Sequence, residues 1–355
     1  MRQSRLKIAV LFGGRSAEHD VSVLSATNVV AALAPDKYEP MPIFVTRQGQ
    51  WLLSRFERGV LATPDSGTEL ALVPGGRGRL IVLGADGQVL GTDRIDMLFP
   101  VLHGLFGEDG SVQGLAEVAR VPLVGCGLLG SATALDKIMA KRLLQAAGIP
   151  VARSVAIGPH DVADFAALER ALDLPIFIKP ARQGSSLGVR KVSASQEFQP
   201  ALDEAFRFDR NILVEEYVAG REIEFSLLED ETGGLFVSSP GEIVPAERQG
   251  FYSYDAKYVD ETGAILKVPA DLPQEVESAM RDMAARAFRA LGCDGMARVD
   301  FFLKEDGVFL INELNTIPGF TDISLYAKAM AASGIAYPEI IDRLVSHGLA
   351  RANRP

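Results

Sequence analysis

Apolar and polar residues follow one another along this chain in blocks typical of an α/β protein. An apolar run at residues 7–12 precedes two glycines and a helical stretch that continues to Leu33, which is how an α/β domain often begins. Further strands are predicted at 95–102, 151–157 and 175–179, and further helices at 133–147, 161–172 and 273–291. We therefore predict an α/β fold in which an N-terminal open parallel sheet is followed by α+β lobes.

The clearest local pattern is a β-hairpin between residues 296 and 315. Two segments of alternating polarity meet at Asp306-Gly307, a pair that favours a two-residue type I′ turn. The cross-strand pairs that this turn predicts are Glu305–Val308, Phe302–Ile311, Asp300–Glu313 and Arg298–Asn315. Because side chains alternate between the two faces, the polar members of the last two pairs share one face, above Phe302 and Ile311.

Two carboxylates that face each other across a hairpin repel, and a cation between them reverses the sign of the interaction. Asp300, Glu313 and Asn315 offer only oxygen ligands with no nearby His or Cys, which favours Mg²⁺ or Mn²⁺ over zinc. The alternative is a surface hairpin with solvated acids. It is disfavoured because the residues predicted on the opposite face are apolar too: Val299, Phe301, Leu303, Leu310 and Leu314.

Composition and charge narrow the class of protein. The chain has 355 residues, enough for two or three domains, and 48% apolar and 23% charged residues, as in ordinary globular proteins. Its net charge of −10 opposes nucleic-acid binding, and no apolar run approaches the ~20 residues that span a bilayer. Only Cys126 and Cys293 occur, without metal-ligand spacing. We expect a cytoplasmic protein without disulfides or membrane contact.

Two glycine-containing loops carry candidate polar groups near the N-terminus. Gly13-Gly14 allow close approach of a ligand, and Glu18 follows where a helix begins. Glu18 is either functional or an ordinary first-turn acid favoured by the helix dipole. His103 starts a second loop, HGLFGEDG, at the carboxyl end of a predicted strand, where open α/β sheets bind ligands. We interpret His103 as functional rather than structural.

A second set of residues suggests phosphate binding. Lys137 lies on a predicted helix that also carries Lys141, Lys179 ends a strand, and the Gly/Ser-rich loop at 183–188 could surround phosphate oxygens. A flexible hairpin is the alternative for that loop. Glu215 is an acid inside an apolar strand, for which an adenine amino group or a ribose hydroxyl could be the partner.

Two further segments bear on the choice of ligand. Residues 125–130 match G-x-G-x-x-G, but no acid follows about 20 residues on, as dinucleotide binding requires. A nicotinamide-dependent dehydrogenase would rest on this segment alone. Residues 239–262 are rich in Tyr and charge and are predicted to form a long loop, which in compact domains is usually a functional lid.

Taken together, these segments resemble the D-alanine–D-alanine ligases of the ATP-grasp superfamily over essentially the full chain. The matching segments are GGRSAEHDVS, HGLFGEDG, IKPARQGSSLGV, VEEYVAGREIEFS, FYSYDAKY, ARVDFFL and INELNTIPGFTDISL. The resemblance implies an N-terminal α/β substrate domain and two ATP-grasp lobes. Their expected ranges are 1–128, 129–218 and 219–355.

The resemblance also implies ATP-dependent ligation of two D-alanines through an acyl phosphate, for peptidoglycan precursors. ATP and two Mg²⁺ (or Mn²⁺) would be bound, D-alanine would occupy two sites, and the chain would form a homodimer. The implied metal ligands are Asp300, Glu313 and Asn315, with Glu313 bridging. The implied nucleotide-binding residues are Lys137, Lys179, Ser185, Ser186, Gly188, Glu215, Tyr217, Val218, Glu222, Lys257, Asn312 and Glu313.

The remaining implied roles concern the substrates. Glu18 would hold the first D-alanine's ammonium group and His103 would lie beside its carboxylate. Arg298 and the Gly319 N–H would form an oxyanion hole, and Ser324 with Leu325 would bind the second carboxylate. Tyr258 would join Ser185 and Glu18 across the three domains.

Three other functions remain in view. A ligase that joins D-alanine to D-lactate would share this fold and would be separable at Tyr258. A non-catalytic ATP-binding regulator is opposed by the complete set of acids and lysines. The dehydrogenase would rest on the glycine pattern alone.

Overall fold

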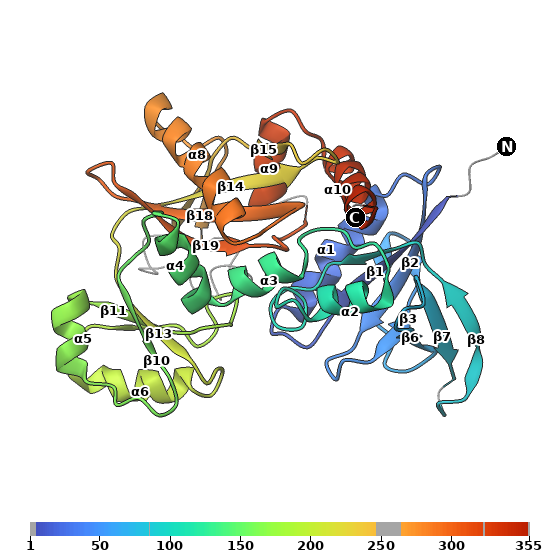
Figure 1. Ribbon diagram of the computed structural model, residues 1–355, viewed down its shortest axis with the longest axis horizontal. Helices are drawn as coiled ribbons and strands as arrows, with labels where there is room; N and C mark the ends of the chain where they lie inside the picture. Colours follow the sequence, from blue (N-terminus) through green and yellow to red (C-terminus); the bar gives the residue numbers. More distant parts are fainter. Residues whose placement is uncertain (1–4, 85, 246–263, 322–323, 354–355) are drawn as a thin grey trace.

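The computed structural model describes residues 5–84, 86–245, 264–321 and 324–353 (Figure 1). Three main sheets follow one another along the chain: a mixed sheet at the N-terminus, a four-stranded central sheet and a C-terminal sheet. The N-terminal sheet lies at one end of the molecule, and the other two lie above one another at the opposite end (Figure 1).

The N-terminal sheet contains a parallel half and an antiparallel half. Strands β1 (Leu6–Gly13), β2 (Tyr38–Val45) and β9 (Met97–Pro100) are parallel, as predicted, with β1 in the centre. The linker region adds antiparallel strands, so the sheet as a whole is mixed. These added strands are β3 (Trp51–Leu53), β6 (Glu69–Leu72), β7 (Arg79–Leu83) and β8 (Val89–Arg94). Strands β4 (Phe56–Glu57) and β5 (Val60–Leu61) form a separate pair.

The order of the strands in the sheet reverses direction at β1. Helix α1 (His19–Ala32) leads from β1 to β2, whereas β9 pairs with the other edge of β1. The carboxyl ends of β1 and β9 are therefore a topological switch point, the place where open α/β sheets bind ligands. The two glycine-containing loops singled out in the sequence follow these two strands, and α2 (Ser111–Ala119) begins after the second loop.

The central sheet is antiparallel in the order β10-β13-β11-β12. Its strands are β10 (Ser154–Ile157), β13 (Ile212–Glu216), β11 (Ile176–Pro180) and β12 (Arg190–Val192). Helices α5 (Phe165–Leu172) and α6 (Ser195–Ala205) pack against one face through a buried cluster that includes Ile176, Ile178 and Val214. The opposite face is left for the cavity described below.

The C-terminal sheet runs in the order β17-β16-β14-β18-β19, with β15 also paired to β14. Its strands are β17 (Ala264–Lys267), β16 (Gly241–Pro245), β14 (Arg221–Glu229), β18 (Met296–Leu303), β19 (Phe309–Asn315) and β15 (Leu235–Val237). Helix α8 (Gln274–Ala290) packs against this sheet. The prediction of a loop at 239–262 is wrong for 241–245, which form β16; residues 246–263 lie outside the described residues.

The buried clusters connect regions that the sequence assigned to different domains. Helices α9 (Leu325–Ala332) and α10 (Tyr337–Ala352) share a core with β1 of the N-terminal sheet. Helix α4 (Lys137–Ala146) buries Ala140 and Leu144 in the core of the C-terminal sheet, not of the central sheet. The division at residues 128 and 218 therefore stays a prediction.

One helix was expected at 133–147, and two are present. Helix α3 (Leu128–Leu135) ends at Asp136, whose backbone is extended (φ −77°, ψ 99°). The Asp136 carboxylate accepts hydrogen bonds from the backbone N–H groups of Ile138 and Met139, each at 3.1 Å, and so caps α4. An Asp favours this position because its side chain satisfies N–H groups that a helix start leaves unpaired.

The hairpin of β18 and β19 exists, but its turn differs from the prediction. Only Gly307 of the Asp306-Gly307 pair has a positive φ (82°), and Lys304 pairs with Val308, so the loop has three residues. This shift alone would misalign the polar pairs. A β-bulge on β19 between Ile311 and Glu313 restores them, because Asn312 is an extra residue there.

The net result is that half of the predicted register is right. Asp300 pairs with Glu313 and Arg298 with Asn315, as predicted. The prediction is wrong nearer the turn, where Phe302 pairs with Leu310 and Phe301 with Ile311. Ile311 therefore lies in the hydrophobic core, and Leu310 takes its predicted place on the face of Phe302.

Candidate active site

A cavity of about 180 Å³ lies between the central sheet and the β18–β19 hairpin. Phe177 on β11 and Phe302 on β18 contribute apolar walls from the two sides. The predicted nucleotide-binding residues that line it are Lys137, Lys179, Ser185, Ser186, Glu215, Tyr217, Val218, Glu222, Asn312 and Glu313. The structure thus brings together, at one cavity, residues from separate motifs. Lys257 and Tyr258 lie outside the described residues.

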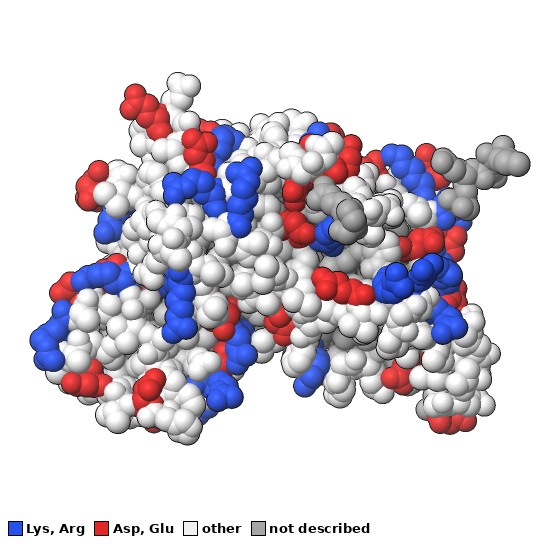
Figure 2. Space-filling model, in the orientation of Figure 1, with Lys and Arg blue, Asp and Glu red and all other residues white. Residues whose placement is uncertain are grey.

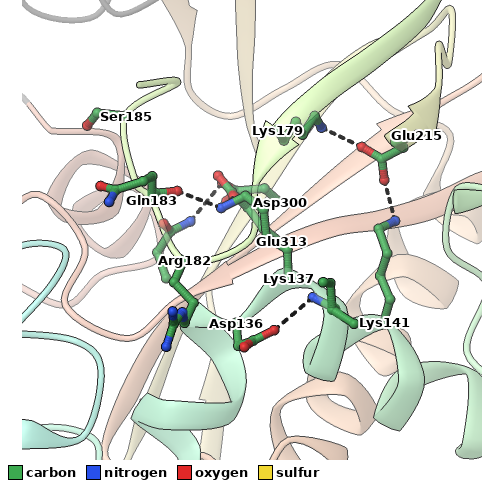
Figure 3. A network of polar contacts seen from close by, with 12 residues as sticks. Asp136, Lys137, Lys141, Lys179, Arg182, Gln183, Ser185, Glu215, Asp300 and Glu313 are labelled. Carbon is green, nitrogen blue, oxygen red and sulfur yellow. Dashed lines mark hydrogen bonds and ion pairs between the residues drawn. The ribbon is translucent and has the colours of Figure 1, made fainter. Parts of the chain in front are cut away.

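Two lysines and one glutamate form a buried group at this cavity, which we call the lysine cluster (Figure 3). Lys179 on β11 and Lys141 on α4 each contact one carboxylate oxygen of Glu215 on β13. Burial raises the pKa of Glu215, but the two cations more than offset it, and its pKa lies below its usual value. The structure gives this acid two lysine partners; contact with an adenine or a ribose stays a prediction.

Lys137 connects the helix start to two other parts of the site. Its Nζ donates to the Gln183 carbonyl at 2.8 Å and lies 3.4 Å from a carboxylate oxygen of Glu313 (Figure 3). Lys137 and Lys141 are four residues apart on α4, so they project from the same face of the helix. One lysine therefore reaches the loop and the hairpin, and the other reaches Glu215.

The Gly/Ser-rich loop adopts a backbone that few residues tolerate. Ser185 and Ser186 have positive φ values of 50° and 58°, and Gly188 has 70°. A Cβ at Gly188 would lie 2.6 Å from the Phe208 ring and 2.9 Å from Pro180, so glycine is needed there for space as well. Strained residues of this kind cluster at ligand clamps, which favours the phosphate-loop interpretation over a flexible hairpin.

Glu18 is not a simple helix cap. It occupies the N-cap position of α1, but its side chain makes no capping hydrogen bond. Its Oε1 instead accepts a hydrogen bond from the Ser185 hydroxyl of the central lobe. A Cβ at Gly184 would lie 2.8 Å from Glu18 Oε2, so the loop passes close against this carboxylate. The structure places the two glycine loops and the phosphate loop around one acid.

The polar face of the hairpin carries a second buried group, the arginine cluster, made of Arg298, Asp300 and Glu224. Arg298 donates to both carboxylate oxygens of Asp300 at 2.7 Å, and its Nε lies 2.9 Å from Glu224. Burial lowers the pKa of Arg298, yet the surrounding acids outweigh it and raise its pKa well above the usual value. Asn315 adds a hydrogen bond to Asp300 at 2.9 Å.

The donor set of this face fits a hard divalent cation. Asp300 and Glu313 face each other across the hairpin, and Asn315 lies beside Asp300. The arginine cluster has two carboxylates for one guanidinium, which leaves an excess of negative charge next to Glu313. No group of three or more His, Cys, Asp or Glu side chains with metal-site geometry occurs among the described residues, and the oxygen donors on this face are two carboxylates and one carboxamide.

His103 ties the N-terminal sheet to the end of the hairpin. Its Nδ1 is 2.9 Å from the Ile317 carbonyl, and its Nε2 is 3.3 Å from the Ser25 hydroxyl. Burial lowers the pKa of His103, so the ring is neutral, with Nδ1–H donating to the carbonyl and Nε2 accepting. This places a neutral imidazole rather than a cation near Glu18.

Glu108, from the same loop, bridges the same two regions. Its carboxylate accepts hydrogen bonds from the N–H groups of Gly104 and Ile317, both at 2.8 Å. Burial, followed by the negative charge of Glu18, raises the pKa of Glu108 to about 8. At neutral pH this carboxyl group is mostly protonated, so it adds little charge to the site.

The segment after the hairpin completes the site. Gly319 lies close to Ser324, since a Cβ at Gly319 would be 3.7 Å from the Ser324 side chain. Ser324 is the N-cap residue of α9, and its hydroxyl donates to the Thr321 carbonyl at 2.7 Å. Leu325, the first residue of α9, is buried. These residues follow Ile317 in the chain, and the Ile317 carbonyl is the hydrogen-bond partner of His103.

The G-x-G-x-x-G segment does not form an open dinucleotide site. The Gly127 N–H at the start of α3 donates to the Asp294 carboxylate at 2.6 Å, so an acid occupies the place of a pyrophosphate. A Cβ at Gly130 would lie 2.6 Å from Cys126 Sγ and from the Cys293 backbone. Both cysteines are free and buried. These glycines therefore serve close packing.

Sequence reasoning assigned no role to three residues that contact this site: Lys141, Glu108 and Glu224. Lys141 had a usable signal, namely its i, i+4 spacing from Lys137. Glu108 stood inside a segment that had already been singled out. Glu224 gave no signal of its own, because its role depends on which strand lies opposite it. Gly184 lies in the loop that had been singled out, but its approach to Glu18 could not be predicted from the sequence.

Two α+β lobes that hold a cavity between them, with lysines on one side and paired acids on the other, define the ATP-grasp class of fold. Comparison with solved structures agrees. The D-alanine-D-alanine ligase of Coxiella burnetii superposes with a TM-score of 0.84 at 33% identity, covering 99% of this chain and 95% of that one. A D-Ala:D-Ser ligase from Enterococcus faecalis gives 0.84 at 34% identity, with 97% and 100% covered.

Sequence relatives define the class more narrowly. Residues 7–126 match the family described as D-ala D-ala ligase N-terminus, and residues 143–346 match D-ala D-ala ligase C-terminus. A D-alanine--D-alanine ligase A from Brucella suis is 62% identical over 99% of this chain and 100% of its own length. One from Mesorhizobium japonicum is 56% identical over 98% and 99%. The chain belongs to the D-alanine–D-alanine ligase family.

Two general features complete the description. No helix within the described ranges is long and apolar enough to cross a membrane. On the face drawn in Figure 2, Lys and Arg side chains are intermixed with Asp and Glu.

Proposed function

We propose that this protein uses ATP to join two molecules of D-alanine into D-alanyl-D-alanine, a precursor for peptidoglycan. The observation that carries the proposal is a pair of buried clusters of opposite net charge: the lysine cluster at the cavity, and the arginine cluster on the strands of the C-terminal sheet whose hairpin forms the other wall of that cavity. The lysine cluster has two cations for one acid, and the arginine cluster has two acids for one cation. A triphosphate complements the first, and a divalent cation complements the second.

The phosphates of ATP would bind between Lys137, Lys179 and the N–H groups of the loop at 185–188. The adenine would lie against Tyr217 and Val218, and the ribose beside Glu222. Asp300, Glu313 and Asn315, with Asn312 adjoining through the bulge, would hold two Mg²⁺ or Mn²⁺. Bound there, the ions would neutralise the phosphates and so reduce their repulsion of an incoming carboxylate.

The first D-alanine would lie at the switch point of the N-terminal sheet. Glu18 is fixed by Ser185 and is suited to bind an ammonium group. His103 is neutral and buried, so it can lie beside a carboxylate without neutralising it as a counter-ion. The carboxylate keeps its charge as a nucleophile toward the terminal phosphate. The resulting acyl phosphate would then be attacked by the amine of the second D-alanine, with release of phosphate.

Charge on the acyl carbonyl oxygen would develop between Arg298 and the Gly319 N–H. Asp300 and Glu224 hold the guanidinium in place, so it need not reorganise during the reaction. The second carboxylate would bind at Ser324 and Leu325, at the start of α9, where the helix dipole favours an anion. The lid containing Lys257 and Tyr258 would exclude water from the acyl phosphate.

The same chemistry would suit a different second substrate. Since one structural relative is a D-Ala:D-Ser ligase, and since D-lactate was an open alternative, the acceptor must be tested directly. We propose that D-alanine is preferred at neutral pH, that the reaction takes place in the cytoplasm, and that the enzyme acts as a homodimer.

The test is incubation of the protein with ATP, Mg²⁺ and D-alanine, alone and with D-lactate or D-serine in competition. Mass spectrometry should find D-alanyl-D-alanine as the main product, with ADP and phosphate. AMP and pyrophosphate as the main D-alanine-dependent products would contradict the mechanism. A depsipeptide or D-alanyl-D-serine as the main product would contradict the acceptor.

A further inference from the structure

Lys141 is a buried cation for which the proposed mechanism has no use. Its side chain is only 5% exposed, and it does not line the cavity. Its Nζ contacts Glu215 Oε1 and donates to the Ala152 carbonyl at 3.3 Å. In Figure 3 it reaches Glu215 from the side opposite Lys179. Lys141 cannot touch a nucleotide in that cavity, so any effect on binding must act through Glu215.

Glu215 would, without Lys141, cancel the charge of Lys179. The two side chains form an ion pair at the cavity, with 3% and 15% of their side-chain surfaces exposed. A paired lysine presents little net field to a phosphate. With Lys141 on the second carboxylate oxygen, these three groups carry one positive charge in excess, and Lys179 is the member of the pair of lysines that lines the cavity, where Glu222 and Glu313 also act on it.

The position of Lys141 is also held from another lobe. Its helix, α4, is packed into the core of the C-terminal sheet through Ala140 and Leu144, whereas Glu215 and Lys179 belong to the central sheet. The contact therefore spans the two lobes beneath the cavity. Burial lowers the pKa of Lys141, and the contact with the Glu215 carboxylate opposes that shift, so the charge of Lys141 depends on this contact.

We infer that Lys141 is a positioning residue for nucleotide phosphates: it occupies Glu215, so that Lys179 keeps a net positive charge toward the ATP site. The inference rests on the proposed function only in that ATP is the ligand. It predicts a selective effect on the phosphates, because the adenosine part of the ligand gains nothing from the excess charge.

Lys141→Met is the informative variant. Methionine is unbranched and apolar, and the remaining Glu215–Lys179 pair is neutral, so the change leaves no unpaired buried charge. Glu215→Gln is unsuitable, because it would leave two buried lysines facing each other. Lys328→Met is the matched control, since Lys328 is exposed on α9 and its loss changes the net charge equally. Lys141→Arg tests rescue by a cation.

The experiment measures dissociation constants of ATP, ADP and adenosine by calorimetry, with thermal melts to show that each variant is folded. We expect Lys141→Met to weaken ATP and ADP about tenfold, or about 1.4 kcal/mol, and adenosine by less than about twofold. Lys328→Met should bind all three like wild type. Lys141→Arg should recover part of the ATP affinity. In turnover, KM for ATP should rise more than kcat falls.

Equal weakening of adenosine and ATP in a folded Lys141→Met variant would overturn the inference, and so would unchanged ATP affinity. If Lys141→Met does not fold, Lys141→Gln provides the same comparison. A wild-type protein that binds ATP but forms no dipeptide would contradict the proposed function while leaving the role of Lys141 intact. A wild-type protein that does not bind ATP would contradict both.

Discussion

The lysine cluster and the arginine cluster are both built from buried ion pairs, but their net charges have opposite signs. In the first, one carboxylate is shared by two ammonium groups; in the second, one guanidinium is shared by two carboxylates. Neither cluster is neutral, although both are buried. Buried charge is costly unless it is compensated, which is why we propose a triphosphate as the ligand beside the lysine cluster and a divalent cation beside the arginine cluster.

The contrast extends to single acids. Glu215 is buried between two cations, and its pKa is lowered; Glu108 is buried with two backbone N–H donors and only a weak influence from Arg298, and its pKa is raised to about 8. Backbone donors alone therefore do not keep a buried carboxylate ionised here. Nearby positive charge decides whether an acid in this molecule acts as an anion.

The largest effect is expected at Glu313, on the hairpin face that also carries Asp300 and Arg298. Glu313→Gln removes one of two facing charges on the hairpin, so the site should lose most of its affinity for divalent cations. Turnover should fall below about a tenth of wild type, a loss above ~1.4 kcal/mol of barrier. Stability of the ligand-free protein should be unchanged or slightly higher, because repulsion between Asp300 and Glu313 is relieved.

Glu305→Gln is the matched control for that variant. Glu305 lies exposed at the turn of the same hairpin, so the same chemical change there should leave turnover near wild type. Steady-state kinetics and urea unfolding measure both quantities. A Glu313→Gln enzyme that retains more than about a tenth of its turnover would refute the metal assignment.

A smaller effect is expected at Gly184, where the absence of a side chain lets the loop pass close to the Glu18 carboxylate. Gly184→Ala places a Cβ 2.8 Å from Glu18 Oε2, closer than real contacts allow, at a glycine whose φ is not positive. Displacement of Glu18 should raise KM for D-alanine about tenfold. Gly91→Ala has open space around its Cβ and should have no effect. Equal kinetics in the two variants would show that Glu18 does not contact the substrate.

Glu108 should affect the stability of the folded protein rather than its catalytic turnover. Burial raises the pKa of Glu108, so the folded protein retains a proton that the unfolded chain releases. Stability from this proton is present below the ordinary pKa of Glu and is lost as pH rises toward about 8. Wild type should therefore lose stability relative to Glu108→Gln across that range, with no further change above it. Parallel unfolding curves at all pH values would contradict the shift.

The smallest effect is expected at the cysteines, which belong to neither cluster. Both thiols are buried, and hydrogen bonding with Cys126 together with burial raises the pKa of Cys293 well above its usual value. Cys126→Ser and Cys293→Ala should each keep turnover within about twofold of wild type. Severe loss of turnover in a variant with a normal melting temperature would reveal a catalytic thiol.

The sequence predicted features that depend on neighbouring residues better than features that depend on packing between distant segments. The Asp300–Glu313 and Arg298–Asn315 pairs were predicted, yet by two errors that cancel. Asp306-Gly307 suggested a two-residue turn, and nothing in the sequence indicated the bulge at Asn312 that restores the register. A bulge depends on tertiary packing of both faces, which alternation of polarity does not encode.

The two clusters illustrate the same limit. Many of the residues that line the cavity were predicted, because they stand in segments that the sequence analysis had already singled out. Lys141 had a signal in its spacing from Lys137, but its role, like that of Glu224, depends on a partner on another strand or helix. The break at Asp136, which separates α3 from α4, was missed because an Asp inside an otherwise helical pattern is a weak signal.

The most direct test of the account follows an oxygen atom. D-Alanine labelled with ¹⁸O in its carboxylate is incubated with the protein, ATP and Mg²⁺, and the released phosphate is analysed by mass spectrometry. If the first carboxylate attacks the terminal phosphorus and the amine displaces phosphate, each dipeptide formed delivers one ¹⁸O to inorganic phosphate, with ADP as the nucleotide. Label found in AMP, or phosphate without label alongside dipeptide, would contradict an acyl phosphate at this site.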